Sequence, residues 1–225
     1  MSGGAGAYLF LLGLACGVSL LPLSYYAVAS PRWLRGLLVF VGALGAGRYL
    51  AMAAFAVIDD PQQIWFWHRL WFGSAIGLTV PGIFAVDALI RHPAMTPEKL
   101  LRRIAPLLAV YAVLALFAQA RAVPDRLMGW HIELMSGWRL FAAVIQAVFV
   151  AGMIAMCLLL IRKIPVSSIR GALALLALAY AGLAADGLLL AFGGWYARPF
   201  LFTEMLTSLS LYHAFRTASA LQGHP

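Results

Sequence analysis

The stretch IWFWHRLWFGSAIGLTVPGIF, residues 64–84, decides how the rest of the chain is interpreted. It is almost entirely apolar and about as long as a helix that crosses the hydrocarbon core of a bilayer. Its tryptophans and its arginine gather in the first half, where interfacial anchors are typically found. We interpret it as the outer part of a membrane-spanning helix, the third of seven.

The composition of the whole chain supports a membrane protein. Hydrophobic residues make up 64% of the 225 residues and charged residues 11%, against about 45–50% and 25% in a soluble domain. The net charge is +8, but the basic residues form no long run. In membrane proteins such residues face lipid headgroups in cytoplasmic loops. We therefore expect the lipid bilayer, and no nucleic acid, as a partner.

Seven segments are long and apolar enough to span a bilayer. They are residues 7–28, 34–58, 63–90, 100–119, 138–161, 169–192 and 199–217. Asp60 before Pro61 is typical of a helix start, with an N-cap followed by proline at the first helical position. The predicted fold is an all-α bundle of seven transmembrane helices over residues 1–217, followed by a cytoplasmic tail, 218–225.

The basic residues predict the orientation of this bundle. Ten of them fall on the side of the first, third and fifth loops and the C-terminal tail: Arg32, Arg35, Arg91, Lys99, Arg102, Arg103, Arg162, Lys163, Arg170 and Arg216. The opposite side holds Arg69, Arg121, Arg126, Arg139 and Arg198. Because cytoplasmic loops are richer in Lys and Arg, we expect the N-terminus outside and the C-terminus in the cytoplasm.

The tryptophans are distributed unevenly between the two sides. The outer side holds Trp65, Trp67, Trp71, Trp130, Trp138 and Trp195, and the inner side only Trp33. One interpretation is an interfacial aromatic belt. Because belts usually occupy both faces, the other is an aromatic pocket open to the outside.

Four of the charged residues within the predicted spans lie at similar depth, well inside the bundle. Arg48, Arg69, Asp186 and Glu204 all fall in the outer half of the bundle, given a rise of about 1.5 Å per residue and a core about 30 Å thick. Charges at this depth mark ion pairs, cavities or function. They could form ion bridges that hold the helices together, or a cradle for a ligand, and the two interpretations are compatible.

Smaller features complete this interpretation of the spans. Glu204, Thr207, Ser208 and Tyr212 are three or four residues apart and predict a polar stripe that faces protein or water. Pro81 is expected to kink the third helix. The small residues GALGAG, 42–47, allow close approach of another helix.

The sequence lacks the residues that several common cofactor and metal sites require. His68 and His213 lie near opposite faces, so a haem between them is not expected. The two lysines lie in inner loops, which excludes a retinal Schiff base. Cys16 and Cys157 have no partner at metal-ligand spacing. We expect neither an enzyme nor a bound cofactor or metal.

The sequence FWHRLWFGSAIGLTVP, 66–81, resembles the N-terminal seven-helix sensor region of bacterial sensor histidine kinases and related diguanylate cyclases. Residues 170–193 and 200–215 are similar to the last two helices of that region, with Asp186 where the family often has Asn. The resemblance implies a sensor in a bacterial cytoplasmic membrane. Because a kinase or cyclase module follows the seventh helix in that family and none is present in this sequence, we expect a stand-alone or truncated sensor region that passes its signal to a separate cytoplasmic or membrane partner.

These observations predict a receptor-like protein that binds a small ligand in the outer half of the bundle. The expected ligand-binding residues are Arg48, Trp67, Arg69, Trp71, Asp186 and Glu204. Two alternatives stay open, a structural subunit of a larger membrane complex and a small proton or solute transporter.

Overall fold

The computed structural model describes residues 3–29, 32–58, 60–91, 96–125, 129–191 and 200–221. These residues form helices and one two-stranded sheet. In chain order they are α1 (Gly3–Ala29), α2 (Arg32–Val57), α3 (Pro61–Gly73), α4 (Ile76–Ile90), α5 (Pro97–Phe117), β1 (Ala120–Asp125), β2 (Gly129–Leu134), α6 (Ser136–Lys163), α7 (Ser167–Ala191) and α8 (Phe200–Leu221).

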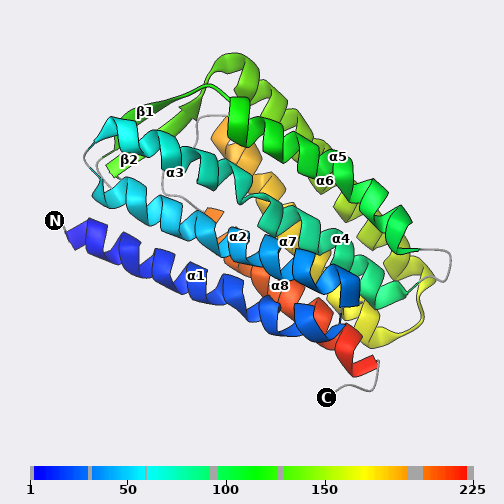
Figure 1. Cartoon of the computed structure of the whole chain (residues 1–225). Coiled ribbons are helices and arrows are strands. Elements are labelled where there is room, and N and C mark those ends of the chain that lie inside the picture. The colour runs from blue at the N-terminus through cyan, green and yellow to red at the C-terminus, as the bar shows by residue number, and fades with distance from the viewer. Residues whose placement is uncertain are drawn as a thin grey trace.

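The helices form an elongated bundle in which successive spans run in opposite directions (Figure 1). Helix α8 packs against α1, α4 and α7, while α2 packs against α1, α3 and α4. Helix α1 begins at one end of the bundle and α8 finishes at the other (Figure 1). The two helices α2 and α8, far apart in the sequence, therefore flank the same interior.

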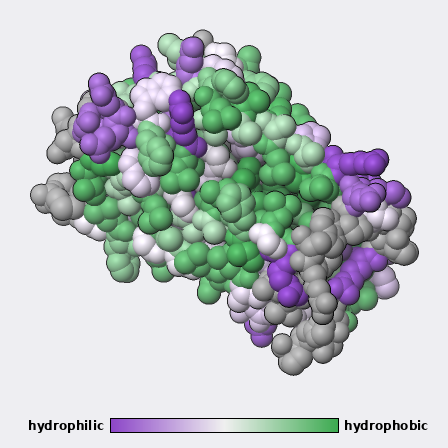
Figure 2. Space-filling model, viewed as in Figure 1, coloured by the Kyte–Doolittle hydropathy of each residue, from purple (hydrophilic) through white to green (hydrophobic). Residues whose placement is uncertain are grey.

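The predicted class, a helical integral membrane protein, is confirmed by the helices and their surface. Six helical segments of the described chain are long and apolar enough to cross a membrane: Gly6–Tyr26, Leu34–Val57, Gln62–Ile90, Glu98–Phe117, Gly137–Lys163 and Ser167–Asp186. Figure 2 shows apolar residues across the middle of the visible face and hydrophilic residues toward both ends. Helix α8 is not among the six, because its polar residues lower its hydropathy.

The helix ends that carry the basic residues of the expected inner side lie together at one end of the bundle (Figure 1). They are the starts of α2, α5 and α7 and the ends of α4, α6 and α8. The hairpin β1–β2 lies at the opposite end, beside the start of α3 (Figure 1). The two ends of the molecule therefore differ in charge.

The third predicted span is interrupted between α3 and α4, at a position that was not predicted from the sequence. Pro81 lies inside α4, which continues through it, whereas the break between α3 and α4 falls at Ser74 and Ala75. There the Ala75 N–H donates to the carbonyl of Phe72 at 3.2 Å instead of to that of Trp71, its partner in a regular α-helix. The break therefore leaves the Trp71 carbonyl available to other donors.

The close approach predicted for residues 42–47 occurs where α2 passes α4. A Cβ on Gly45 would lie 3.1 Å from the Cα of Gly77. A Cβ on Gly77 would collide with the Cα of Gly45 and lie 3.0 Å from the carbonyl oxygen of Val41. Glycine at both positions lets the two backbones touch, as small residues do in membrane helix pairs.

The hairpin β1–β2 was not predicted from the sequence, where residues 120–137 read as a loop. Arg121 pairs with Glu133 across the two strands, and their side chains form an exposed salt bridge of 2.6 Å. The Trp130 indole N–H donates to the carbonyl of Ile58 at 2.7 Å, which docks the hairpin on the end of α2. Gly129 has a φ of 71°, a conformation that glycine adopts without strain.

Candidate functional site

A buried ion pair joins α2 to α8 within the bundle. The Nη2 atom of Arg48 lies 2.8 Å from Oε1 of Glu204, and Nε of Arg48 donates to the same oxygen at 2.9 Å. The two side chains are 13% and 3% exposed. Desolvating two charges is costly, and it is offset only where geometry is good and further hydrogen bonds satisfy the ions. The net contribution of the ion pair therefore depends on the hydrogen bonds that the neighbouring groups make to it.

One of those further bonds connects the pair to the interrupted helix. Nη1 of Arg48 donates to the free carbonyl of Trp71 at 3.2 Å, and the Ser74 hydroxyl donates to the same carbonyl at 2.8 Å. The guanidinium carbon of Arg48 also lies 4.7 Å from the centre of the Trp71 ring. Arg48 thus binds both the carboxylate on α8 and the backbone at the junction between α3 and α4.

Other polar atoms beside the pair are buried without a hydrogen-bond partner among the described residues. They include Oε2 of Glu204, the hydroxyl of Tyr49 and the indole nitrogen of Trp71. Tyr49 is 2% exposed and interacts electrostatically with Glu204. Buried polar groups are normally hydrogen-bonded, to protein or to ordered water. Because the Tyr49 hydroxyl interacts with the Glu204 carboxylate, these two groups can satisfy each other or bind water, and the Trp71 indole is a donor without a partner among the described residues.

Asp186 does not take part in the Arg48–Glu204 ion pair. It is 5% exposed and accepts a hydrogen bond from the hydroxyl of Thr203, the residue before Glu204 on α8. It makes no salt bridge with any other residue that the structure describes. Its carboxylate ties α7 to α8 next to Glu204.

Arg69 does not lie among the buried charges, where we expected it from the sequence. Its side chain is exposed, with the guanidinium carbon 5.5 Å from the centre of the Trp65 ring. Arg69 and Trp71 are two residues apart, which is about 200° around a helix, so Arg69 projects away from the face that meets Arg48. Of the four charges expected to form a cluster, Arg48 and Glu204 form an ion pair, and neither Arg69 nor Asp186 forms a salt bridge with another described residue.

Trp67 lies on the same face as Trp71 but one turn nearer the hairpin. It packs against a cluster of Phe55, Ile64, Phe72 and Ile132, which joins α2 and α3 to β2. This position is at the end of the bundle that the hairpin covers, and Trp67 makes no contact with the Arg48 side chain that the structure records. Of the two aromatic residues proposed for the ligand, Trp71 is the one beside the ion pair.

The tryptophans of the expected outer side differ in their surroundings. Trp65 is 49% exposed, as in an interfacial belt, whereas Trp71 lines the buried pair and Trp130 anchors the hairpin. Trp195 lies outside the described residues. The aromatic side chains therefore divide between the lipid boundary and the interior.

The predicted polar stripe of α8 faces protein. Glu204, Thr207 and Ser208 are buried, and Tyr212 packs edge-on against Tyr25 of α1, with ring centroids 5.2 Å apart. The Thr207 and Ser208 hydroxyls donate to carbonyls four residues earlier. The two hydroxyls are thus satisfied within the helix, whereas Oε2 of Glu204 has no partner among the described residues.

Two buried polar side chains, Tyr49 at the ion pair and His68 on the hairpin side of α3, were not predicted from the sequence. Tyr49 follows Arg48 directly, but a tyrosine in an apolar span gives no sign that its hydroxyl approaches a carboxylate from another helix. The buried His68, 3% exposed, lies between the rings of Trp65 and Phe72, and neither ring nitrogen finds a partner among the described residues. In the sequence, only the position of His68 within the aromatic stretch 64–72 could have indicated that its side chain is buried.

No protein-family profile matches the chain, and no curated protein is significantly similar to it.

Proposed function

We propose that this protein is a receptor-like sensor that binds a small ligand in the outer half of its helix bundle. It would pass a conformational signal to a cytoplasmic or membrane partner. The observation that carries the proposal is the double role of Arg48, which bonds the carboxylate of Glu204 at 2.8 Å and the carbonyl of Trp71 at the helix break at 3.2 Å. A change at the ion pair would therefore reach the α3–α4 junction directly.

The unpartnered atoms indicate what such a ligand would need. Oε2 of Glu204 would accept a hydrogen bond, the indole of Trp71 would donate one, and the hydroxyl of Tyr49 could do either. A ligand that competes for Glu204 would weaken the contact between Arg48 and the Trp71 carbonyl. Binding shifts a conformational equilibrium only when the ligand prefers one state, and a junction with two hydrogen-bonding arrangements would supply the two states.

The proposal includes seven crossings, with α8 as the seventh, the N-terminus outside and the C-terminus in the cytoplasm of a bacterium. Helix α8 packs against α1, α4 and α7, so its polar stripe faces protein rather than lipid. The basic helix ends share one end of the bundle (Figure 1), which would be the cytoplasmic end by the positive-inside rule.

Thermal unfolding of the purified protein against a collection of small polar metabolites tests the proposal. A ligand at about 100 times its dissociation constant stabilises the folded state by about 2.7 kcal/mol, which would raise the melting temperature of the wild-type protein. Glu204→Gln should abolish that rise while the protein still inserts. The matched control is Glu133→Gln on the exposed hairpin, which should keep it. If the ligand raised the melting temperature of Glu204→Gln as much as that of the wild type, Glu204 would not be part of the ligand site.

A proton or solute transporter is the second candidate. A broken helix beside a buried carboxylate is typical of transporter sites in the membrane interior. Gradient-dependent uptake into proteoliposomes, lost in Glu204→Gln, would favour transport over sensing. A structural subunit would instead co-purify stoichiometrically with a larger complex at native expression.

A further inference from the structure

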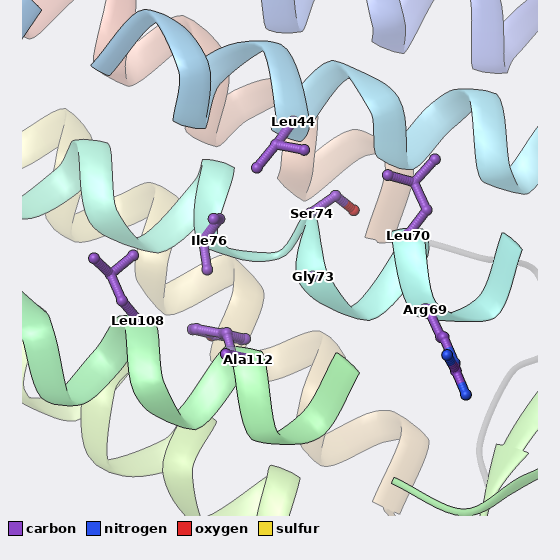
Figure 3. Close-up of a pocket in the computed structure, with 9 residues that line it drawn as sticks. Leu44, Arg69, Leu70, Gly73, Ser74, Ile76, Leu108 and Ala112 are labelled. Atoms are coloured by element: carbon purple, nitrogen blue, oxygen red, sulfur yellow. The ribbon is translucent and has the colours of Figure 1, made fainter. Parts of the chain in front are cut away.

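A recess of about 270 Å³ opens where α3 breaks from α4, on the side that faces α5 (Figure 3). Its walls come from α2, α3, α4 and α5 and are mostly apolar. They include Leu44, Leu70, Ile76, Leu108 and Ala112. Ser74, whose hydroxyl bonds the free Trp71 carbonyl, also lines it. The recess is therefore an apolar hollow formed by the break itself.

Arg69 stands at the edge of this recess. Its side chain extends from α3 away from Leu44 and from the break (Figure 3). It lies within the apolar span Gln62–Ile90, is exposed, and forms no salt bridge with another described residue. The Trp65 ring beside it is of the type that marks the headgroup level of a bilayer. A cation at this depth favours an anionic group supplied by its surroundings.

The size of the recess limits what can occupy it. Drug-sized ligands fill pockets of about 300–1,000 Å³, and this recess is smaller and open to the side. An apolar hollow with a single guanidinium at its edge fits a slender amphiphile with a phosphate at one end. We propose that the recess holds part of an acyl chain of a bilayer phospholipid whose phosphate binds Arg69. This site is separate from the Arg48–Glu204 pair and does not depend on the proposed function.

Native mass spectrometry of the full-length protein, purified in detergent and titrated with dioleoylphosphatidylglycerol, tests the lipid site. The wild-type protein should bind one lipid more tightly than any further ones. Arg69→Gln should weaken that binding about five-fold, because a basic residue near the headgroups contributes on the order of 1 kcal/mol. Ala112→Trp should weaken it at least as much, because the larger side chain fills the recess without removing the charge.

The matched control is Arg139→Gln, which removes another exposed arginine, at the start of α6 and outside the recess. It should bind lipid like the wild type. Lipid binding that stays unchanged in Arg69→Gln or in Ala112→Trp would overturn the proposal, as would an equal loss in Arg139→Gln. If millimolar inorganic phosphate displaced the lipid, Arg69 would be a binding site for free phosphate rather than for a lipid headgroup. A protein dimer without bound lipid would assign the recess to a second copy of the chain.

Discussion

Arg48→Met is expected to lower the free energy of unfolding by about 3–5 kcal/mol, because removing one partner of a buried ion pair leaves the other charge uncompensated. The carboxylate of Glu204 is 3% exposed and already has one oxygen without a partner among the described residues. Without Arg48, its second oxygen would lose both charge-assisted hydrogen bonds. Glu204→Leu should lower the free energy of unfolding by a similar amount, because the Arg48 guanidinium would stay buried without its carboxylate partner.

The double variant Arg48→Met with Glu204→Leu should recover most of this loss. Replacing a buried pair by apolar side chains of similar volume is often neutral or stabilising, since neither charge is then desolvated. The two losses should therefore be strongly non-additive in a double-mutant cycle. The double variant should fold but no longer respond to any ligand that acts through the pair, which would separate the structural from the signalling role.

Reversible unfolding in mixed micelles, followed by tryptophan fluorescence, would measure these free energies. The control is the exposed pair Arg121–Glu133, whose side chains are 73% and 34% exposed. Arg121→Met should cost at most about 1 kcal/mol. If Arg48→Met cost no more than Arg121→Met, the pair would not be the desolvated element that the proposed function requires.

The helix positions could be predicted because each span has its own local signals. Asp60 accepts a hydrogen bond from the N–H of Gln62, and Thr96 from that of Lys99, as N-caps before prolines should. The polar stripe of α8 follows the period of a single helix. The Arg48–Glu204 pair was within reach of sequence reasoning, because depth along each helix depends only on residue number.

What could not be predicted depends on contacts between distant segments. Depth along a helix does not give the direction of a side chain, so Arg69 was grouped with Arg48 although it projects from the opposite face of α3. At the break, the freed carbonyl of Trp71 accepts a hydrogen bond from Arg48, which comes from another helix. The hairpin docks on the end of α2 through Trp130, a contact between distant segments that the local sequence pattern does not give.

Gly77→Ala is the second substitution with a large expected effect. The added Cβ would lie 2.7 Å from the backbone nitrogen of Gly45 and 3.0 Å from the carbonyl oxygen of Val41. These are backbone atoms that no side-chain rotation can move, so α2 and α4 would have to separate. Overpacking of this kind costs about 1–3 kcal/mol. Separation would also draw Arg48 on α2 away from the junction that immediately precedes α4.

Gly152→Ala on α6 is the matched control, because a Cβ there would meet nothing within 4 Å. Since alanine favours a helix interior over glycine by up to about 1 kcal/mol, this substitution should be neutral or slightly stabilising. The same chemical change should therefore have opposite signs at the two positions in the micelle unfolding assay. If Gly77→Ala were as stable as Gly152→Ala, α2 and α4 would not be in backbone contact, and the geometry that brings Arg48 to Trp71 would have to be abandoned.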